Sequence, residues 1–225
     1  MDAKTSRQLP YHTGMALGNG TKKNFVVDTV RGRMTEMRLT PLEIRGIAEA
    51  FVAARRGARP LAAFPVRLPN ALDDSVAVQE EALRLTGERV AGWKVAMVPP
   101  PLRVPLAAER LAGPVDAATL IRCDADAIVE VAVYEGGFAA VEAEFVVVLG
   151  DEPRPRAEGF TAESVRDAVA WIHAGVEVAS SPLATLNDLG PLAVVCDHGN
   201  NAGVVIGPAI EGWRDLAPTS LASRT

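Results

Sequence analysis

Two glutamates that lie two residues apart in an apolar segment are the first candidates for chemistry. Glu142 and Glu144 belong to residues 138–149, in which the other ten positions are apolar. In a strand, residues i and i+2 point to the same face, so both carboxylates would project side by side. Two like charges held that close repel each other and lose solvation, which a cation, water or a shifted pKa must offset. Two interpretations remain open: a solvated glutamate face on a half-exposed strand, or a set of oxygen ligands for a divalent cation.

A third carboxylate strengthens the metal interpretation. Glu177 is the only charged residue of the short apolar segment 176–179. A lone acid in such a strand is rarely buried without a partner. Three carboxylates without an accompanying His or Cys cluster favour a hard cation, Mg²⁺ or Mn²⁺, over zinc. Their spacing along the chain does not by itself place Glu177 beside Glu142.

The fourth candidate is a lysine in an apolar strand. Lys94 lies within residues 90–97, two positions after Gly92, a residue type that lets a ligand approach the backbone. Such a lysine either extends its ammonium group to solvent or faces a polar cavity. In a cavity it would bind a substrate carboxylate or act as an acid or base.

Other reactive residue types fit structural roles better. His173 is expected late in a helix, in a core or capping role, and His198 in a polar turn. No serine occurs in a Gly-x-Ser-x-Gly motif and no glycine-rich phosphate loop precedes a helix. The sequence therefore gives no support to a triad hydrolase or a nucleotide-binding protein.

The composition is that of an ordinary soluble globular protein. Of 225 residues, 48% are hydrophobic and 23% are charged, which is enough chain to bury a core without metal or disulfide cross-links. The net charge of −5 argues against nucleic-acid binding. Cys123 and Cys196 lie far apart, so we expect neither a disulfide framework nor a cysteine zinc site, and a cytoplasmic location. No apolar run approaches the roughly 18 residues of a membrane span.

The chain divides at about residue 40. Residues 1–39 carry seven basic and three acidic side chains and lack a sustained apolar period. We expect them to be a disordered extension or a misassigned start, in preference to a nucleic-acid arm. Residues 40–225 are expected to form one α+β domain, because helices come first and hairpin-linked strands follow without regular βαβ alternation.

Capping signals place the helices of this domain. Thr40 opens a capping box with proline at the first helical position, and Gly57 ends the helix. A second helix is expected from an Asp73 or Asp74 cap to about Thr86, and a third that starts at Thr161 and has His173 near its end. Strands are predicted at 90–97, 128–134, 138–149, 176–179, 192–196 and 202–207, with the second and third of these joined as a hairpin by a Gly-Gly turn.

Taken in chain order, five short motifs resemble a known family. They are Leu72-Asp73-Asp74 with Val78-Gln79, Gly92-Trp93-Lys94-Val95, Val141-Glu142-Ala143-Glu144, Gly175-Val176-Glu177-Val178, and Asp197 with Gly203-Val204-Val205-Ile206-Gly207. Together they resemble the 2-keto-4-pentenoate hydratases of the fumarylacetoacetate hydrolase superfamily. The resemblance runs from about Thr40 to Gly207.

The resemblance implies a fold, a cofactor and a reaction. It implies a mixed β-roll of the fumarylacetoacetase C-terminal type, with Mg²⁺ or Mn²⁺ held by Glu142, Glu144 and Glu177. Lys94 matches the lysine of the family's Gly-aromatic-Lys motif and would be catalytic. Asn201, in the turn that replaces the family's Asn-Ala-Ser-Ser, is a secondary candidate for substrate binding. The implied reaction, of a kind found in aromatic catabolism, adds water to a small 2-hydroxy-dienoate or 2-oxo-enoate to give a 4-hydroxy-2-oxo acid.

Departures from the family pattern keep alternatives open. After the third carboxylate the chain reads Val178-Ala179-Ser180-Ser181 where many hydratases have Val-Asp-Ser-Arg, so a 2-oxo acid decarboxylase or a carbon–carbon hydrolase is the near alternative. The family continues beyond the position of Gly207 with a further helix and strand, whereas residues 211–225 show no strong period. We therefore expect the fold to be incomplete. The chain would then form a homo-oligomer, be one subunit of a decarboxylase–hydratase pair, or be a remnant without activity.

Overall fold

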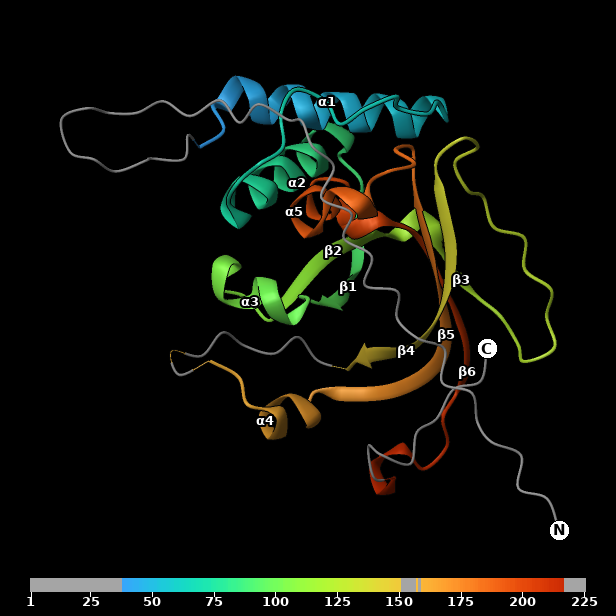
Figure 1. The fold of residues 1–225 in the computed structure, drawn as a ribbon. Coiled ribbons are helices and arrows are strands. Elements are labelled where there is room, and N and C mark those ends of the chain that lie inside the picture. Colours follow the sequence, from blue (N-terminus) through green and yellow to red (C-terminus); the bar gives the residue numbers. More distant parts are fainter. Residues whose placement is uncertain (1–37, 151–156, 158, 217–225) are drawn as a thin grey trace, which may run out of the picture. The chain divides into compact units, whose positions relative to one another are not determined.

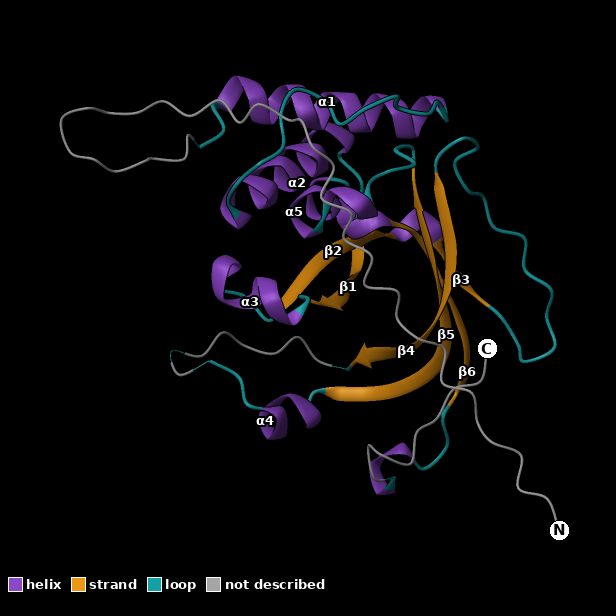
Figure 2. Cartoon of the chain, viewed as in Figure 1, coloured by secondary structure: helices purple, strands orange, loops and turns teal. Residues whose placement is uncertain are grey.

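A computed structural model describes residues 38–150, 157 and 159–216 of the chain (Figure 1). The α-helices are Pro41–Gly57 (α1), Leu72–Thr86 (α2), Pro100–Leu106 (α3), Ala162–Arg166 (α4) and Pro191–Cys196 (α5). The strands are Val90–Met97 (β1), Arg110–Asp116 (β2), Leu120–Arg122 (β3), Phe138–Leu149 (β4), Val169–Ser181 (β5) and Asn201–Ala209 (β6). Short 3₁₀ turns connect several of them, and the α+β class predicted from the sequence is confirmed (Figure 2).

Helix α1 begins as its sequence predicts. The Thr40 hydroxyl accepts a hydrogen bond from the Glu43 backbone N–H at 3.3 Å, and the Glu43 carboxylate accepts one from the Thr40 N–H at 2.8 Å. This reciprocal pair satisfies two backbone donors that the helix itself leaves free. The boundary expected at residue 40 lies just inside the packed fold, because Leu39 is buried and its N–H donates to Asp74. Residues 1–37 lie outside the described part of the chain.

The main apolar core lies between the helices. Buried side chains of α1, including Ile47 and Phe51, pack against Val78 and Ala82 of α2. The same core takes in Leu183, Leu186, Ala193 and Cys196, from the segment that follows β5 and from α5. Both cysteines are free thiols. Within the described residues, no helix combines the length and apolar character that crossing a membrane requires.

The strands form two sheets. The larger has the order β3-β6-β5-β4, with β4, β5 and β6 antiparallel and β3 parallel to β6. Strands β1 and β2 form a separate antiparallel pair that lies near the concave side of the curled larger sheet (Figure 2). Strand β4 is therefore an outer strand of the described sheet, and β5 lies inside it.

Two predicted strands and one cap are wrong. Helix α2 begins after Ala71 without a side-chain cap, because buried Asp74 accepts hydrogen bonds from Arg38 and Leu39 instead. Residues 128–134 form no strand, and Ile128 is 96% exposed. The expected hairpin is absent because β4 pairs with β5 along nearly its whole length, which offers more ladder hydrogen bonds. Residues 192–196 belong to helix α5, for which proline at the first helical position was the missed signal.

The third predicted helix is much shorter than expected. Thr161 does form its N-terminal capping box, but α4 ends at Arg166. Val169 and Ile172, expected on a helical face, instead belong to the thirteen-residue strand β5, as does His173. Val169, Trp171 and Ile172 at the start of β5 are β-branched or aromatic, and such residues pack better on a pleated sheet than on a helix.

Candidate active site

The pairing of β4 with β5 brings the three predicted carboxylates together. Glu142 is the direct cross-strand partner of Glu177, and Glu144 lies opposite Gly175 on the same face. One carboxylate oxygen from each glutamate lies within 4.8 Å of the other two. The convergence depends on strand register, which the spacing along the chain did not reveal.

The three carboxylates differ in their surroundings. Glu142 and Glu144 are exposed, whereas Glu177 is 3% exposed. Asn201 donates its side-chain amide to Glu177 Oε1 at 2.9 Å, and Lys94 Nζ lies 3.3 Å from Glu177 Oε2. Burial raises the pKa of Glu177; the Asn201 hydrogen bond and the charge of Lys94 act in the opposite direction.

Lys94 faces this cluster and not the solvent. Its side chain is only 12% exposed, and Nζ also donates to Asn200 Oδ1 at 3.2 Å. Alternation along β1 places Trp93, Val95 and Met97 on the opposite, exposed face. Of the two sequence interpretations, the polar-cavity one describes its position.

A cavity of about 610 Å³ adjoins the cluster. Its polar wall includes Lys94, Glu144, Glu177 and Arg122, the last residue of β3. Apolar residues complete the lining, among them Leu120, Val146, Val148, Val204 and Ile206. An apolar cavity with a few charged groups at one wall suits a small organic acid.

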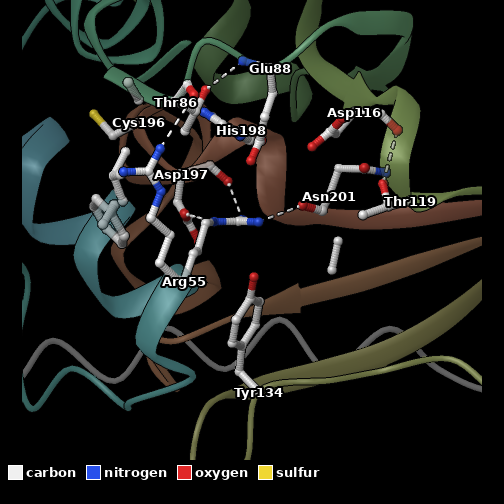
Figure 3. A pocket seen from close by; sticks show the side chains of 15 residues that line it. Arg55, Thr86, Glu88, Asp116, Thr119, Tyr134, Cys196, Asp197, His198 and Asn201 are labelled. Carbon is white, nitrogen blue, oxygen red and sulfur yellow. Dashed lines mark hydrogen bonds and ion pairs between the residues drawn. The ribbon is translucent and has the colours of Figure 1, made fainter. Parts of the chain in front are cut away.

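A second, smaller pocket is lined by residues of α1, of α2 and of the turn that precedes β6 (Figure 3). Arg55 of α1 forms an ion pair there with Asp197, with Nε 2.6 Å from Oδ1. The guanidinium also donates to the backbone oxygens of Asp197 and Asn201, at 3.1 and 2.9 Å, and lies over the ring of Tyr134. Sequence reasoning missed Arg55, because no local pattern pairs residues 142 positions apart.

His173 and His198, the histidines of the described residues, take no part in the cluster. His173 Nδ1 hydrogen-bonds the Gly207 carbonyl at 2.8 Å, which ties β5 to β6. His198 lies in the predicted polar turn, where burial and the nearby positive charge of Arg55 lower its pKa to about 4. It is therefore neutral at neutral pH, and its Nε2 has no hydrogen-bond partner among the described residues.

The cluster has the chemistry of a hard-cation site. Oxygens bound to one Mg²⁺, Mn²⁺ or Ca²⁺ ion at about 2.0–2.6 Å are separated by up to about 5 Å, which the 4.8 Å limit here satisfies. All three donors are carboxylates, and no histidine or cysteine of the described chain joins them. The residues present thus fit a divalent cation.

Comparison with known proteins identifies the fold and stops short of a family. No family model and no curated protein matches the sequence. Two solved structures of 4-oxalocrotonate decarboxylase from Pseudomonas putida G7 match 76% of this chain. The one complexed with magnesium and adipate is 16% identical with a TM-score of 0.55, and the one complexed with calcium and acetate is 17% identical with a TM-score of 0.53. The match spans 65% and 64% of those two chains, so this chain shares their fold over about two thirds of their length.

Proposed function

We propose that this protein is a metal-dependent lyase of the fumarylacetoacetate hydrolase superfamily that acts on a small 2-oxo acid in the cytoplasm. The carrying observation is the convergence of Glu142, Glu144 and Glu177 beside the ammonium group of Lys94. The fold shared with 4-oxalocrotonate decarboxylase supports the superfamily and its mixed β-roll. The reaction proposed first is hydration of a 2-hydroxy-dienoate or 2-oxo-enoate to a 4-hydroxy-2-oxo acid.

Glu142, Glu144 and Glu177 would hold Mg²⁺ or Mn²⁺. A divalent cation in that position would supply Lewis-acid stabilisation of negative charge on the substrate's 2-oxygen. The protein prepares one ligand in advance, because Asn201 and Lys94 fix the orientation of the Glu177 carboxylate.

Lys94 supplies the charge that an anionic substrate needs. Three glutamates and one dication leave about one net negative charge by simple summation, which would repel a carboxylate. The ammonium group of Lys94 offsets it from the wall of the cavity, where Nζ lies 3.3 Å from Glu177 Oε2. From there Lys94 orients the 2-oxo acid or transfers a proton to it.

Decarboxylation of a 2-oxo acid is the second candidate, and one specific observation favours it. Arg122 lines the same cavity, and no hydrogen bond or ion pair involves its side chain within the described residues. Arg122 and Leu120 belong to one strand, and Leu120 is in register with Val204, the strand partner of Glu177. A guanidinium a few strands from the carboxylates suits the far end of a dicarboxylate, and the magnesium complex of the decarboxylase contains one, adipate.

The test is turnover by purified protein with added Mg²⁺ or Mn²⁺. A 2-hydroxy-dienoate and a 2-oxo dicarboxylate are offered separately, with water addition followed by loss of diene absorbance and decarboxylation by release of CO₂. Lys94→Met keeps the apolar stem of the side chain and removes the ammonium. Because a charge-assisted contact is worth about 1.5–3 kcal/mol, we expect turnover to fall at least roughly ten- to a hundredfold while Mn²⁺ still binds.

The control is Arg110→Met, which removes an exposed cation of β2 whose described side-chain hydrogen bond is to the neighbouring Glu109 carbonyl. It should match the unaltered protein. Normal turnover by Lys94→Met would remove Lys94 from the mechanism. Failure of the unaltered protein to bind either cation would refute the proposed function as a whole.

A further inference from the structure

We infer that Arg55 is a positioning residue that holds the turn at residues 197–201 in the shape that Lys94 and Glu177 require. The inference rests on the proposed function and extends it to a side chain on a different element, helix α1. Arg55 does not contact the carboxylate cluster; it contacts the backbone and side chain of the segment that does.

One guanidinium group binds both ends of this turn. Arg55 Nε and Nη2 donate to the side chain and the backbone oxygen of Asp197, and Nη1 donates to the backbone oxygen of Asn201 (Figure 3). The planar fork of an arginine can make such bonds in several directions at once. Arg55 thereby fixes the distance between the first and last residues of the turn.

The backbone of the turn needs an external hold. His198, Gly199 and Asn200 all have positive φ, of 54°, 67° and 58°. The left-handed region is less favourable for residues with a Cβ atom than for glycine, although Asn and His adopt it more often than most, so His198 and Asn200 hold a sparsely populated conformation. Such a conformation persists only where surrounding contacts over-determine it.

Strand β2 supplies the opposing surface. A Cβ atom at Gly113 would lie 2.2 Å from the His198 carbonyl oxygen, so the two backbones are in direct contact. Gly113 is also the strand partner of Lys94. The turn is therefore confined between Arg55 on one side and the strand pair that carries Lys94 on the other.

The side chains of the turn transmit this placement to the site. Asn200 accepts from Lys94 Nζ, and the next residue, Asn201, donates to Glu177 Oε1. A shift of the turn would therefore disturb both the lysine and the one buried carboxylate at once. Outer partners of metal ligands commonly change metal affinity or activity by about 10- to 100-fold when they are lost.

A purely structural role for Arg55 would be to neutralise Asp197, whose side chain is fully buried. Lysine at position 55 would keep that positive charge but could not bridge Asp197 and Asn201 as the arginine fork does. The adjoining pocket of about 190 Å³ has polar groups, among them Glu88 and Thr119, beside apolar ones in its lining, and it leaves room for water beside a lysine. Arg55→Lys thus separates the two roles.

The experiment compares Arg55→Lys with Arg45→Lys, which alters an exposed i,i+4 ion pair with Glu49 on the same helix. Three quantities are measured: the thermal midpoint, hydrogen exchange of the backbone amides of residues 198–203, and the Kd for Mn²⁺. For Arg55→Lys we expect a midpoint near that of the control, faster exchange in the turn, and Mn²⁺ binding about tenfold weaker. Exchange and Mn²⁺ affinity equal to those of Arg45→Lys would overturn the inference.

A second variant covers failure of Arg55→Lys to fold. Arg55→Met combined with Asp197→Leu removes both charges, so that no buried charge is left unpaired, and also removes the bridge. It should fold and show the same fast exchange and weak Mn²⁺ binding. If it binds Mn²⁺ normally, or if neither variant folds, Arg55 is a residue of the fold and the inference is wrong. If the unaltered protein binds no Mn²⁺, the proposed function fails, and hydrogen exchange alone still decides whether Arg55 holds the turn.

Discussion

The two sides of the carboxylate cluster are built differently. On the β5 side, Glu177 is buried and bonded to Asn201 and Lys94, and the turn that carries Asn201 is held by Arg55. On the β4 side, Glu142 and Glu144 are exposed, and no side-chain hydrogen bond or ion pair to them occurs within the described residues. The protein thus fixes one carboxylate in advance and leaves two solvated. We call the β5 side, with Glu177, the buried half and the β4 side, with Glu142 and Glu144, the open half. The buried half is expected to fix where the cation binds, and the open half to give the cation and the substrate access.

The largest effect is expected on cation affinity, when one glutamate from each side of the cluster is substituted in turn. Glu177→Gln keeps an oxygen for Asn201 but removes the charge and with it the prearranged ligand. We expect its Kd for Mn²⁺ to rise by at least about 100-fold, beyond the range typical of outer partners. Glu142→Gln removes a solvated ligand that water can replace, so a rise of roughly tenfold is expected. Calorimetric titration of both variants at one pH measures the difference.

Equal losses in the two glutamine variants would show that the burial of Glu177 gives it no special weight. Thermal midpoints are recorded alongside, because Glu177→Gln also leaves Lys94 with Asn200 as its described partner. A Glu177→Gln protein that unfolds at room temperature would make the ligand comparison impossible, and Glu177→Asp, which keeps the charge, then replaces it. That variant should bind Mn²⁺ more weakly than Glu142→Gln does.

The open half was the easier one to predict from sequence. Glu142 and Glu144 share a face by the period of two alone, which is a local property of any strand. The position of Glu177 depends on the register between β4 and β5, and the hold by Arg55 depends on a contact across 142 residues. Such pairings are set by the packing of whole elements, so sequence reasoning could propose Glu177 on chemistry but could not place it.

The same division explains the errors in the fold. The capping box at Thr40 and the strand at 90–97 are local signals, and both are confirmed. Val169 and Ile172 fit a helical face and a strand equally well over a short window. Tertiary pairing with β4 decided for the strand, and it also left residues 128–134, the expected partner, outside the sheet. Local sequence patterns therefore predict the open half of the site, which has few contacts, whereas the buried half depends on contacts between residues far apart in the chain.

The buried half should also be the acid-sensitive one. Burial and the charge of Arg55 lower the pKa of His198 to about 4, whereas an unfolded histidine titrates near 6.5. Between these pH values the unfolded chain binds the proton more tightly than the folded protein does. The titration of His198 therefore leaves the free energy of unfolding unchanged above pH 6.5 and lowers it progressively as the pH falls toward 4. At about 1.4 kcal/mol per pH unit, the full loss is roughly 3–4 kcal/mol. Urea unfolding at pH 7, 6 and 5 measures it.

His198→Asn is the matched variant, because asparagine tolerates the positive φ of this position and does not titrate. Its stability should decline less on acidification, with the difference confined to the range between about pH 6.5 and 4. The negative charges of Asp197 and Asp116 act against the lowered pKa of His198 and are unchanged in the variant. Parallel pH profiles for the two proteins would show that His198 is not the group responsible.

The smallest effect is expected on the free energy of unfolding, when an apolar residue of β4 is truncated. Val141 of β4 and Val178 of β5 are direct cross-strand partners, yet Val141 is 69% exposed and Val178 is 2% exposed. Val178→Ala should lower the free energy of unfolding by roughly 2 kcal/mol, since buried methyl groups are lost and a cavity remains. Val141→Ala should change it by less than about 0.5 kcal/mol in the isolated chain. The assembly expected from the sequence, a homo-oligomer or a pair with a partner subunit, predicts a different result where it forms, because a partner covering β4 would bury Val141. Urea unfolding of Val141→Ala at low and high protein concentration distinguishes the cases. A loss of unfolding free energy in Val141→Ala that grows with protein concentration indicates that a partner covers β4. A loss near that of Val178→Ala at every concentration contradicts the exposure of β4 in the isolated chain.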